Sequence, residues 1–280
     1  MAYYADAAPL ANSAIVEGTE ATLVFDANVL RFATGLRAAV DNPGRPPLRH
    51  LVLSHVHADH AYGIGTFVPP AEAWASRFTR DRLAYWRGQP LTGQAEEFRA
   101  YDPSFEAGML ATRLVVPQRA VETPTVIELG GGVRVALRLE RDAHTQGDLW
   151  GLVEPDGVVL CGDLWMNQVE PYFGNGTLTG SLAACAHLRD AAAATYLPGH
   201  GLAAPLPGAN ADPMERLIVW LLDQVPEGIA RGLRGEALRR EVRRAFEAQA
   251  VTPGGIDFAS RWDGFLEDSV EKAEADLAGA

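Results

Sequence analysis

The chain has 280 residues, of which 48% are hydrophobic and 21% are charged, a composition that excludes a disordered chain and is ordinary for a globular protein with a sizeable core. Asp and Glu number 36 against 24 Lys and Arg, so the formal net charge is −12, and Lys272 is the single lysine. The chain has no basic tract to neutralise a phosphate backbone, which argues against a nucleic acid as partner.

The chain start and the cysteines bear on the compartment. The first ten residues lack the basic flank and apolar run of a secretory signal, and no later stretch reaches the roughly 18 apolar residues of a membrane span. Cys161 and Cys185 are too few for a disulfide framework, although they would suffice for one bridge. We therefore predict a cytoplasmic protein without a membrane partner.

Short apolar runs bounded by turn residues recur through the first two thirds of the chain and predict β-strands. Stretches of helical character lie between them, so the order of elements favours an α/β or α+β class over an all-β one. The predicted strands are 21–25, 48–53, 133–139, 158–161 and 195–197, and the predicted helices include 70–86 and 178–194.

The hydrophobic period changes near Asp212, after which apolar residues recur at helical spacing to the end of the chain. We predict a main domain over residues 1–210 and a C-terminal helical extension over residues 211–280. A long polar, Arg-rich stretch broken by Pro and Gly interrupts the main domain, and it predicts an inserted lobe over about 70–120.

Four side chains of types that commonly bind metals fall within six residues, directly after the predicted strand 48–53: His55, His57, Asp59 and His60. Imidazoles in or near a core need a strong partner, and a metal ion supplies one. On an extended turn, His55 and His57 point the same way and can share one ion. Asp59 and His60, at the start of the following helix, can face a second ion. Surface histidines in a loop are the weaker interpretation.

Three further candidates follow other predicted strands. His144 comes after the strand 133–139, Asp163 after 158–161, and His200 after 195–197. Open sheets place their sites beyond the carboxyl ends of strands, so we expect these side chains near the His55–His60 motif.

With these motifs the sequence resembles the metallo-β-lactamase superfamily. Residues 55–60 match the family's His-x-His-x-Asp-His signature, His144 its later single histidine, Asp163 its bridging aspartate and His200 its last histidine. The resemblance covers about residues 10–205. It implies a four-layer αβ/βα sandwich of two packed sheets, here with the C-terminal helical extension, and a site in the cleft at one edge.

The resemblance also implies a dinuclear metal site. Zinc suits this mix of imidazole and carboxylate ligands, although the ligand types also allow iron or manganese. Asp59 would in addition act as the catalytic residue that orients the attacking hydroxide, while Asp26 and Thr145 would support the ligands from behind. On this resemblance the first zinc ion takes His55, His57 and His144, the second takes Asp59, His60 and His200, and Asp163 lies between the two.

Aromatic and amide residues in the loop after Asp163 predict a substrate-binding wall, with packing of the loop onto the sheet as the alternative. Two features of one group of true β-lactamases are absent, since neither a Cys at position 163 nor a Lys shortly after it is present. The Tyr that lactonases of the superfamily place three residues after the bridging Asp is Met166. The expected substrate-binding residues are Trp165, Asn167, Tyr172 and Phe173.

These observations lead to the hypothesis of a zinc-dependent hydrolase acting on a small-molecule ester, thioester or lactone through a metal-bound hydroxide. A β-lactam or amide hydrolase and an iron-dependent oxidative enzyme of the same superfamily are the alternatives. A nuclease would need a basic track, and a binding protein with an inactive site is disfavoured because all seven ligand positions hold competent residues. The sequence leaves the oligomeric state open.

Overall fold

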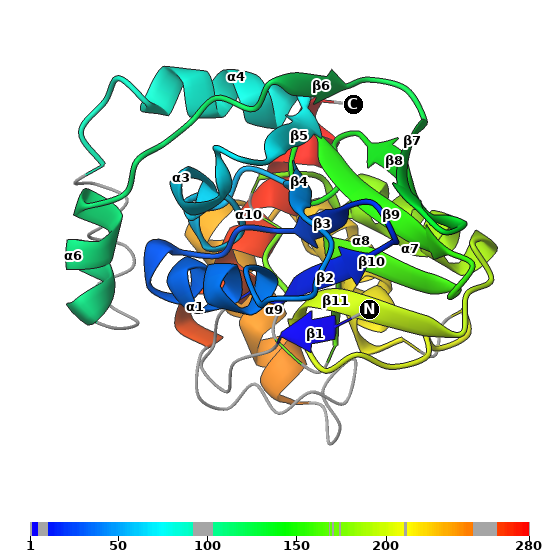
Figure 1. Cartoon of the computed structure of the whole chain (residues 1–280). Coiled ribbons are helices and arrows are strands. Elements are labelled where there is room, and N and C mark those ends of the chain that lie inside the picture. The colour runs from blue at the N-terminus through cyan, green and yellow to red at the C-terminus, as the bar shows by residue number, and fades with distance from the viewer. Residues whose placement is uncertain are drawn as a thin grey trace.

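The computed structural model has the layered architecture that the resemblance implies, with two mixed β-sheets packed face to face and helices on both outer faces (Figure 1). The structure describes residues 2–4, 11–91, 103–167, 169, 171–173, 175–209, 212–248 and 262–279. None of the helices within these ranges is both long and apolar enough to cross a membrane.

The first sheet is parallel from its third strand onward. The second sheet is antiparallel except for the pairing of its last two strands in chain order. The first sheet runs in the order β1 (Ala2–Tyr4), β2 (Ser13–Glu17), β3 (Thr22–Phe25), β4 (Leu48–Val52), β5 (Glu72–Ser76) and β6 (Arg119–Val121). The second runs in the order β11 (Thr195–Gly201), β10 (Val158–Asn167), β9 (Asp148–Glu154), β8 (Val133–Glu140) and β7 (Thr125–Gly130).

Helices cover the outer face of each sheet. Those of the first half of the chain flank the first sheet, and those of the second half flank the second (Figure 1). The helices are α1 (Leu30–Val40), α2 (Ala58–Ala61), α3 (Ile64–Phe67), α4 (Arg77–Trp86), α6 (Pro103–Leu110), α7 (Leu178–Asp190), α8 (Pro213–Ala230), α9 (Gly235–Glu247) and α10 (Trp262–Gly279).

The alternation of side chains along each strand creates the layers. In β3, Leu23 and Phe25 face the core between the two sheets, whereas Val24 faces the helices of the first half. In β10, Leu160 faces the same inter-sheet core and Val159 faces the C-terminal helices. Both faces of these strands are therefore buried, which is why they read as continuous apolar runs.

Two sequence-based expectations about the elements need comment. The helix predicted over 70–86 is wrong in its first part, since β5 occupies Glu72–Ser76 and only α4 is helical. Ala73 and Ala75 are good helix formers, but they are fully buried on the helix-facing side of a strand that pairs in parallel with β4, and this packing overrides their propensity. The helix predicted over 178–194 is confirmed as α7, which ends at Asp190.

The segments predicted as an inserted lobe and a C-terminal extension both pack against the sheets. The ends of the 70–120 segment form β5 and β6, while residues 92–102 lie outside the described residues. The expected boundary at 210/211 also falls outside them. Side chains of α8, α9 and α10 share one hydrophobic core with β10 and α7, so the helical extension covers the outer face of the second sheet.

Candidate metal centre

The turn that follows β4 carries the histidine motif. Leu53 hydrogen-bonds the backbone of the neighbouring β5, and the chain then leaves the sheet at Ser54. His57 keeps an extended backbone (φ −62°, ψ 149°) as the residue before α2, so the helix starts at Ala58. The motif therefore divides as its spacing predicts, with two residues on the turn and two on the short helix.

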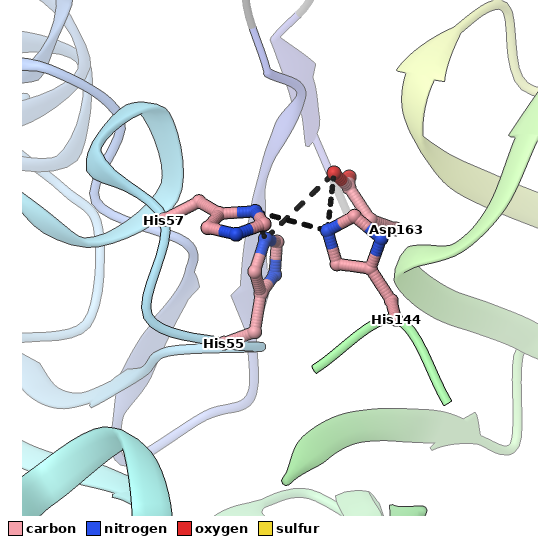
Figure 2. Close-up of side chains that lie close together, drawn as sticks. All are labelled: His55, His57, His144 and Asp163. Atoms are coloured by element: carbon pink, nitrogen blue, oxygen red, sulfur yellow. Dashed lines mark hydrogen bonds and ion pairs between the residues drawn. The ribbon is translucent and has the colours of Figure 1, made fainter. Parts of the chain in front are cut away.

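The first group of potential ligands consists of His55, His57, His144 and Asp163, whose side chains converge on one point (Figure 2). His57 Nδ1 lies 3.0 Å from His55 Nε2 and 2.9 Å from His144 Nε2. Asp163 Oδ2 lies 3.3 Å from His144 Nε2 and 3.7 Å from His55 Nε2. A tetrahedral site with metal–ligand distances of about 2.1 Å has edges of about 3.4 Å, so these spacings fit a single ion.

The second group consists of Asp59, His60 and His200. His200 Nε2 lies 3.3 Å from Asp59 Oδ2 and 3.4 Å from His60 Nε2. Asp163 reaches this group as well, since its Oδ1 lies 3.1 Å from His60 Nε2 and its Oδ2 lies 3.5 Å from His200 Nε2. The Asp163 carboxylate therefore lies between the two groups.

Two glycines shape the backbone around Asp163. Gly162 has φ +54°, in the left-handed region that favours glycine, and the pairing of β10 with β11 is irregular there. A Cβ atom on Gly199 would collide with Asp163 Oδ1. This buried oxygen makes no contact of hydrogen-bond geometry within the described residues, although His60 Nε2 lies 3.1 Å away, as expected for two atoms that share a metal ion. The donor set and the orphaned oxygen fit a divalent cation.

The electrostatics of the two groups differ. Burial lowers the pKa of His144 to about 3 and that of His55 well below its usual value. Burial also acts on His60 and His200, but Asp163 and Asp59 outweigh it, so the pKa of His60 rises well above its usual value and that of His200 rises to about 9. In the metal-free protein these two rings therefore bind protons, and a metal ion would replace those protons.

Asp26, expected behind the ligand motif, lies at the end of β3 with a left-handed backbone (φ 65°). Its carboxylate accepts hydrogen bonds from the Ser54 backbone N–H at 2.6 Å and the Ser54 hydroxyl at 2.8 Å. Asp26 Oδ2 also lies 2.8 Å from His60 Nδ1. The contact orients His60 so that its Nε2 faces the cluster.

Thr145, also expected behind the ligands, holds the loop next to His144 and does not contact the ring. Its hydroxyl and its backbone N–H donate to the carboxylate of Asp148, at 2.6 and 2.9 Å, rather than to the ring of His144. Burial raises the pKa of Asp148 to about 7. Thr145 and Asp148 therefore fix the backbone of the loop that carries His144. The spacing Thr-x-x-Asp before an apolar strand was the available sequence signal for Asp148.

Of the expected substrate-binding residues, two lie in the core instead. Trp165 is 1% exposed and Phe173 is 0% exposed, and both pack among the side chains between β10 and the C-terminal helices. The indole N–H of Trp165 donates to Asp212 Oδ2 at 2.6 Å. These two rings therefore do not line a substrate wall, and packing, the alternative for this loop, is what the structure shows. Trp165 lies on the same face of β10 as Val159 and Cys161, which the C-terminal helices cover.

The other two lie near the ligand groups. The ring centroid of Tyr172 is 6.0 Å from that of His57 and 6.3 Å from that of His144, so Tyr172 borders the first group. The side-chain amide of Asn167 donates to the backbone carbonyl of Leu202 at 2.6 Å, which ties the end of β10 to the chain after His200.

The remaining histidines and cysteines lie apart from the two groups. His50 accepts a hydrogen bond from Trp74, and His187 pairs with Glu140 at 2.9 Å. Cys161 and Cys185 are buried free thiols. A pocket of about 490 Å³ on the second sheet includes His187 and Glu140 but no member of the two groups. The two groups of potential ligands therefore lie outside this pocket.

Comparison with known proteins decides the family. The model of the metallo-β-lactamase superfamily matches residues 9–200. The chain belongs to this superfamily. No curated protein matches the sequence.

Solved structures support the same fold. The stereoselective inverting sec-alkylsulfatase Pisa1 from Pseudomonas sp. is similar over 97% of this chain and 48% of its own, with a TM-score of 0.72 and 13% identity. The present chain thus spans about half the length of that sulfatase. A metallo-β-lactamase from Pontibacter korlensis is similar over 73% of this chain and 87% of its own (TM-score 0.53, 16% identity). The metallo-β-lactamase FIM-1 from Pseudomonas aeruginosa, in a mono-zinc form, is similar over 70% of this chain and 78% of its own (TM-score 0.51, 16% identity).

Proposed function

We propose that the protein is a dinuclear zinc hydrolase that cleaves an ester, thioester or lactone. The observation that carries this proposal is the pair of ligand groups on either side of Asp163, each with its potential ligand atoms within 4.8 Å of one another. Imidazole and carboxylate ligands suit zinc. The mono-zinc form described for the similar FIM-1 structure also favours this metal.

When bound, a pair of zinc ions supplies a hydroxide nucleophile at neutral pH and positive charge for the developing oxyanion. Asp59 has a separate role in this proposal. Burial opposes its ionisation, but His60 and His200 outweigh that effect and lower the pKa of Asp59 to about 2. Its carboxylate therefore stays ionised near neutral pH, so it would accept a hydrogen bond from the attacking water and orient it.

The side chains around the cluster favour leaving groups that depart without a proton. Asp59 and Asp163 are committed to the ligand groups, and Asp26 to His60. Lys272, the single lysine, lies in α10 and pairs with Asp276 at 2.9 Å. It is therefore occupied elsewhere, and neither protonates an amide nitrogen nor binds the carboxylate of a β-lactam. Thiolates and alkoxides need no such donor.

A sulfate ester is the second candidate substrate. The similarity to the sec-alkylsulfatase extends over 97% of the chain and so includes the C-terminal helices, whereas the similarities to the two β-lactamases cover 73% and 70%. Hydrolysis of an alkyl sulfate also releases an alcohol, and a positively charged metal pair would stabilise the charge on the sulfate oxygens.

The experiment combines metal analysis with a substrate panel. We expect about two zinc ions per chain in protein purified without chelator, as measured by plasma mass spectrometry. Among a thioester, an aryl ester, a lactone, a secondary alkyl sulfate and a penicillin, kcat/KM should be highest for one of the first three. The highest value for the sulfate would favour the second candidate, and the highest value for the penicillin would overturn both. A content of one zinc ion per chain that does not increase when zinc is added would overturn the dinuclear model.

A further inference from the structure

The histidines of the two groups do not all turn the same ring nitrogen toward the cluster. His55, His60, His144 and His200 present Nε2, whereas His57 presents Nδ1. A neutral imidazole has one N–H and one lone pair. His57 therefore offers a lone pair to an ion only in the tautomer that has its proton on Nε2.

One contact selects that tautomer. Asn175 Oδ1 lies 2.6 Å from His57 Nε2. An amide oxygen accepts hydrogen bonds and does not donate them, so the contact requires the proton on Nε2 and leaves the lone pair on Nδ1. We propose that Asn175 is a positioning residue that keeps His57 in its Nδ1-coordinating tautomer and thereby sets the affinity of the first group for its ion. The inference rests on the proposed metal centre.

Hydrogen bonds hold the backbone next to Asn175 in place. Its exposed side chain is therefore positioned near His57. Thr177 donates its backbone N–H to the carbonyls of Asp142 and Ala143, both at 3.0 Å, and its hydroxyl to that of Asp142 at 2.6 Å. A Cβ atom on Gly176 would collide with the Ala143 carbonyl oxygen, so the two segments are in close contact. The backbone next to Asn175 is thus attached to the loop that carries His144.

The same segment also orients His144. The backbone carbonyl oxygen of Tyr172 lies 3.0 Å from His144 Nδ1 and so directs Nε2 of that ring into the cluster. Two of the three histidines of the first group therefore depend on residues just before α7. Both acceptors are neutral, whereas the acceptor behind His60 is the carboxylate of Asp26. A carboxylate makes an imidazole a stronger ligand than a neutral acceptor does.

The test measures zinc affinity by competition with a chromophoric chelator. In Asn175→Ala we expect one of the two binding steps to weaken about tenfold while the other changes less than about threefold. Asn175→Asp should retain or raise the affinity, because its carboxylate still accepts from Nε2. Asn42→Ala is the matched control, since it removes the same amide from an exposed turn at the opposite end of β4.

A second readout does not depend on metal. Long-range proton–nitrogen spectra of the metal-free protein, at a pH where His57 is neutral, should show its proton on Nε2 in the wild type and a mixture of tautomers in Asn175→Ala. An unchanged tautomer and unchanged zinc affinity in Asn175→Ala would overturn the inference alone. Wild-type protein that binds no zinc would overturn the proposed metal centre and, with it, the inference.

Discussion

The first and second ligand groups use the same residue types and lie on either side of one carboxylate, yet they stand in opposite electrostatic surroundings. In the first group, burial dominates and keeps His144 neutral, with a pKa of about 3. In the second, burial is outweighed by Asp163 and Asp59, and His200 has a pKa of about 9. The number of carboxylates facing each ring, and not its depth in the protein, decides which group binds protons when metal is absent.

The largest effect is expected where the two groups meet. Asp163→Ala should lower the zinc content from about two ions to below one per chain, because both groups lose a shared ligand. The value of kcat/KM should fall by about three orders of magnitude, since bound ions supply several kcal/mol of charge stabilisation. Plasma mass spectrometry and initial rates measure the two effects. Cys161→Ala, a buried change on the same strand, should retain both ions.

A variant of the second group should separate the two halves. Asp59→Asn keeps the shape of the side chain but removes its negative charge, so the ion of the second group should bind more weakly and that of the first should remain. We expect kcat to fall by about two orders of magnitude with the fold intact by circular dichroism. Loss of both ions in this variant would show that the groups do not bind metal independently.

The raised pKa of His200 predicts how metal-free protein responds to alkali. A pKa raised from 6.5 to about 9 on folding contributes stability that is fully present below pH 6.5 and is lost as the pH rises through about 9. The melting temperature of chelator-treated protein should therefore fall between pH 6.5 and 9.5. His200→Gln should show a smaller fall, with the remainder due to His60. Equal slopes for the two proteins would contradict the assigned charge of the second group.

The smallest effect is expected at Trp165, which lies on the same strand as Asp163 but is not a proposed ligand. Trp165→Phe removes the N–H that donates to Asp212, which should lower the free energy of unfolding by about 1.5–3 kcal/mol, the usual contribution of a hydrogen bond to a charged group. Both ions should stay bound. Denaturant unfolding and metal analysis check the two parts, with Trp220→Phe in α8 as control. Loss of zinc would mean that this bond also supports the ligand groups.

The sequence predicts the ligand motif well because the motif is local. His55 to His60 are neighbours along the chain, and the spacing alone determines which of them lie on the turn and which on α2. The other ligand candidates are found through the rule that sites follow strand ends, although Asp163 and His200 lie within irregular strands rather than after them. The layer order follows from the apolar runs and from the family resemblance.

Other features depend on contacts between distant segments and could not be read from the sequence. Asn175 meets His57 across 118 positions of the chain, and no spacing rule links them. Strand alternation places Trp165 on the same face of β10 as Val159 and Cys161, but only the packed structure shows that the C-terminal helices cover this face. The pairing of β5 with β4 likewise decides a segment whose alanines favour a helix.

The shared core of β10 and the C-terminal helices has a consequence for protein synthesis. Residues of α8 leave the ribosome about 50 positions after β10, which at ~5–20 residues per second is a delay of roughly 2–10 s. During that time the outer face of the second sheet, with Trp165 and Val159, has no helical cover from α8. A chain that ends near residue 210 would contain every proposed metal ligand, yet the hydrophobic outer face of its second sheet would lack the cover of α8, so chaperones should bind it.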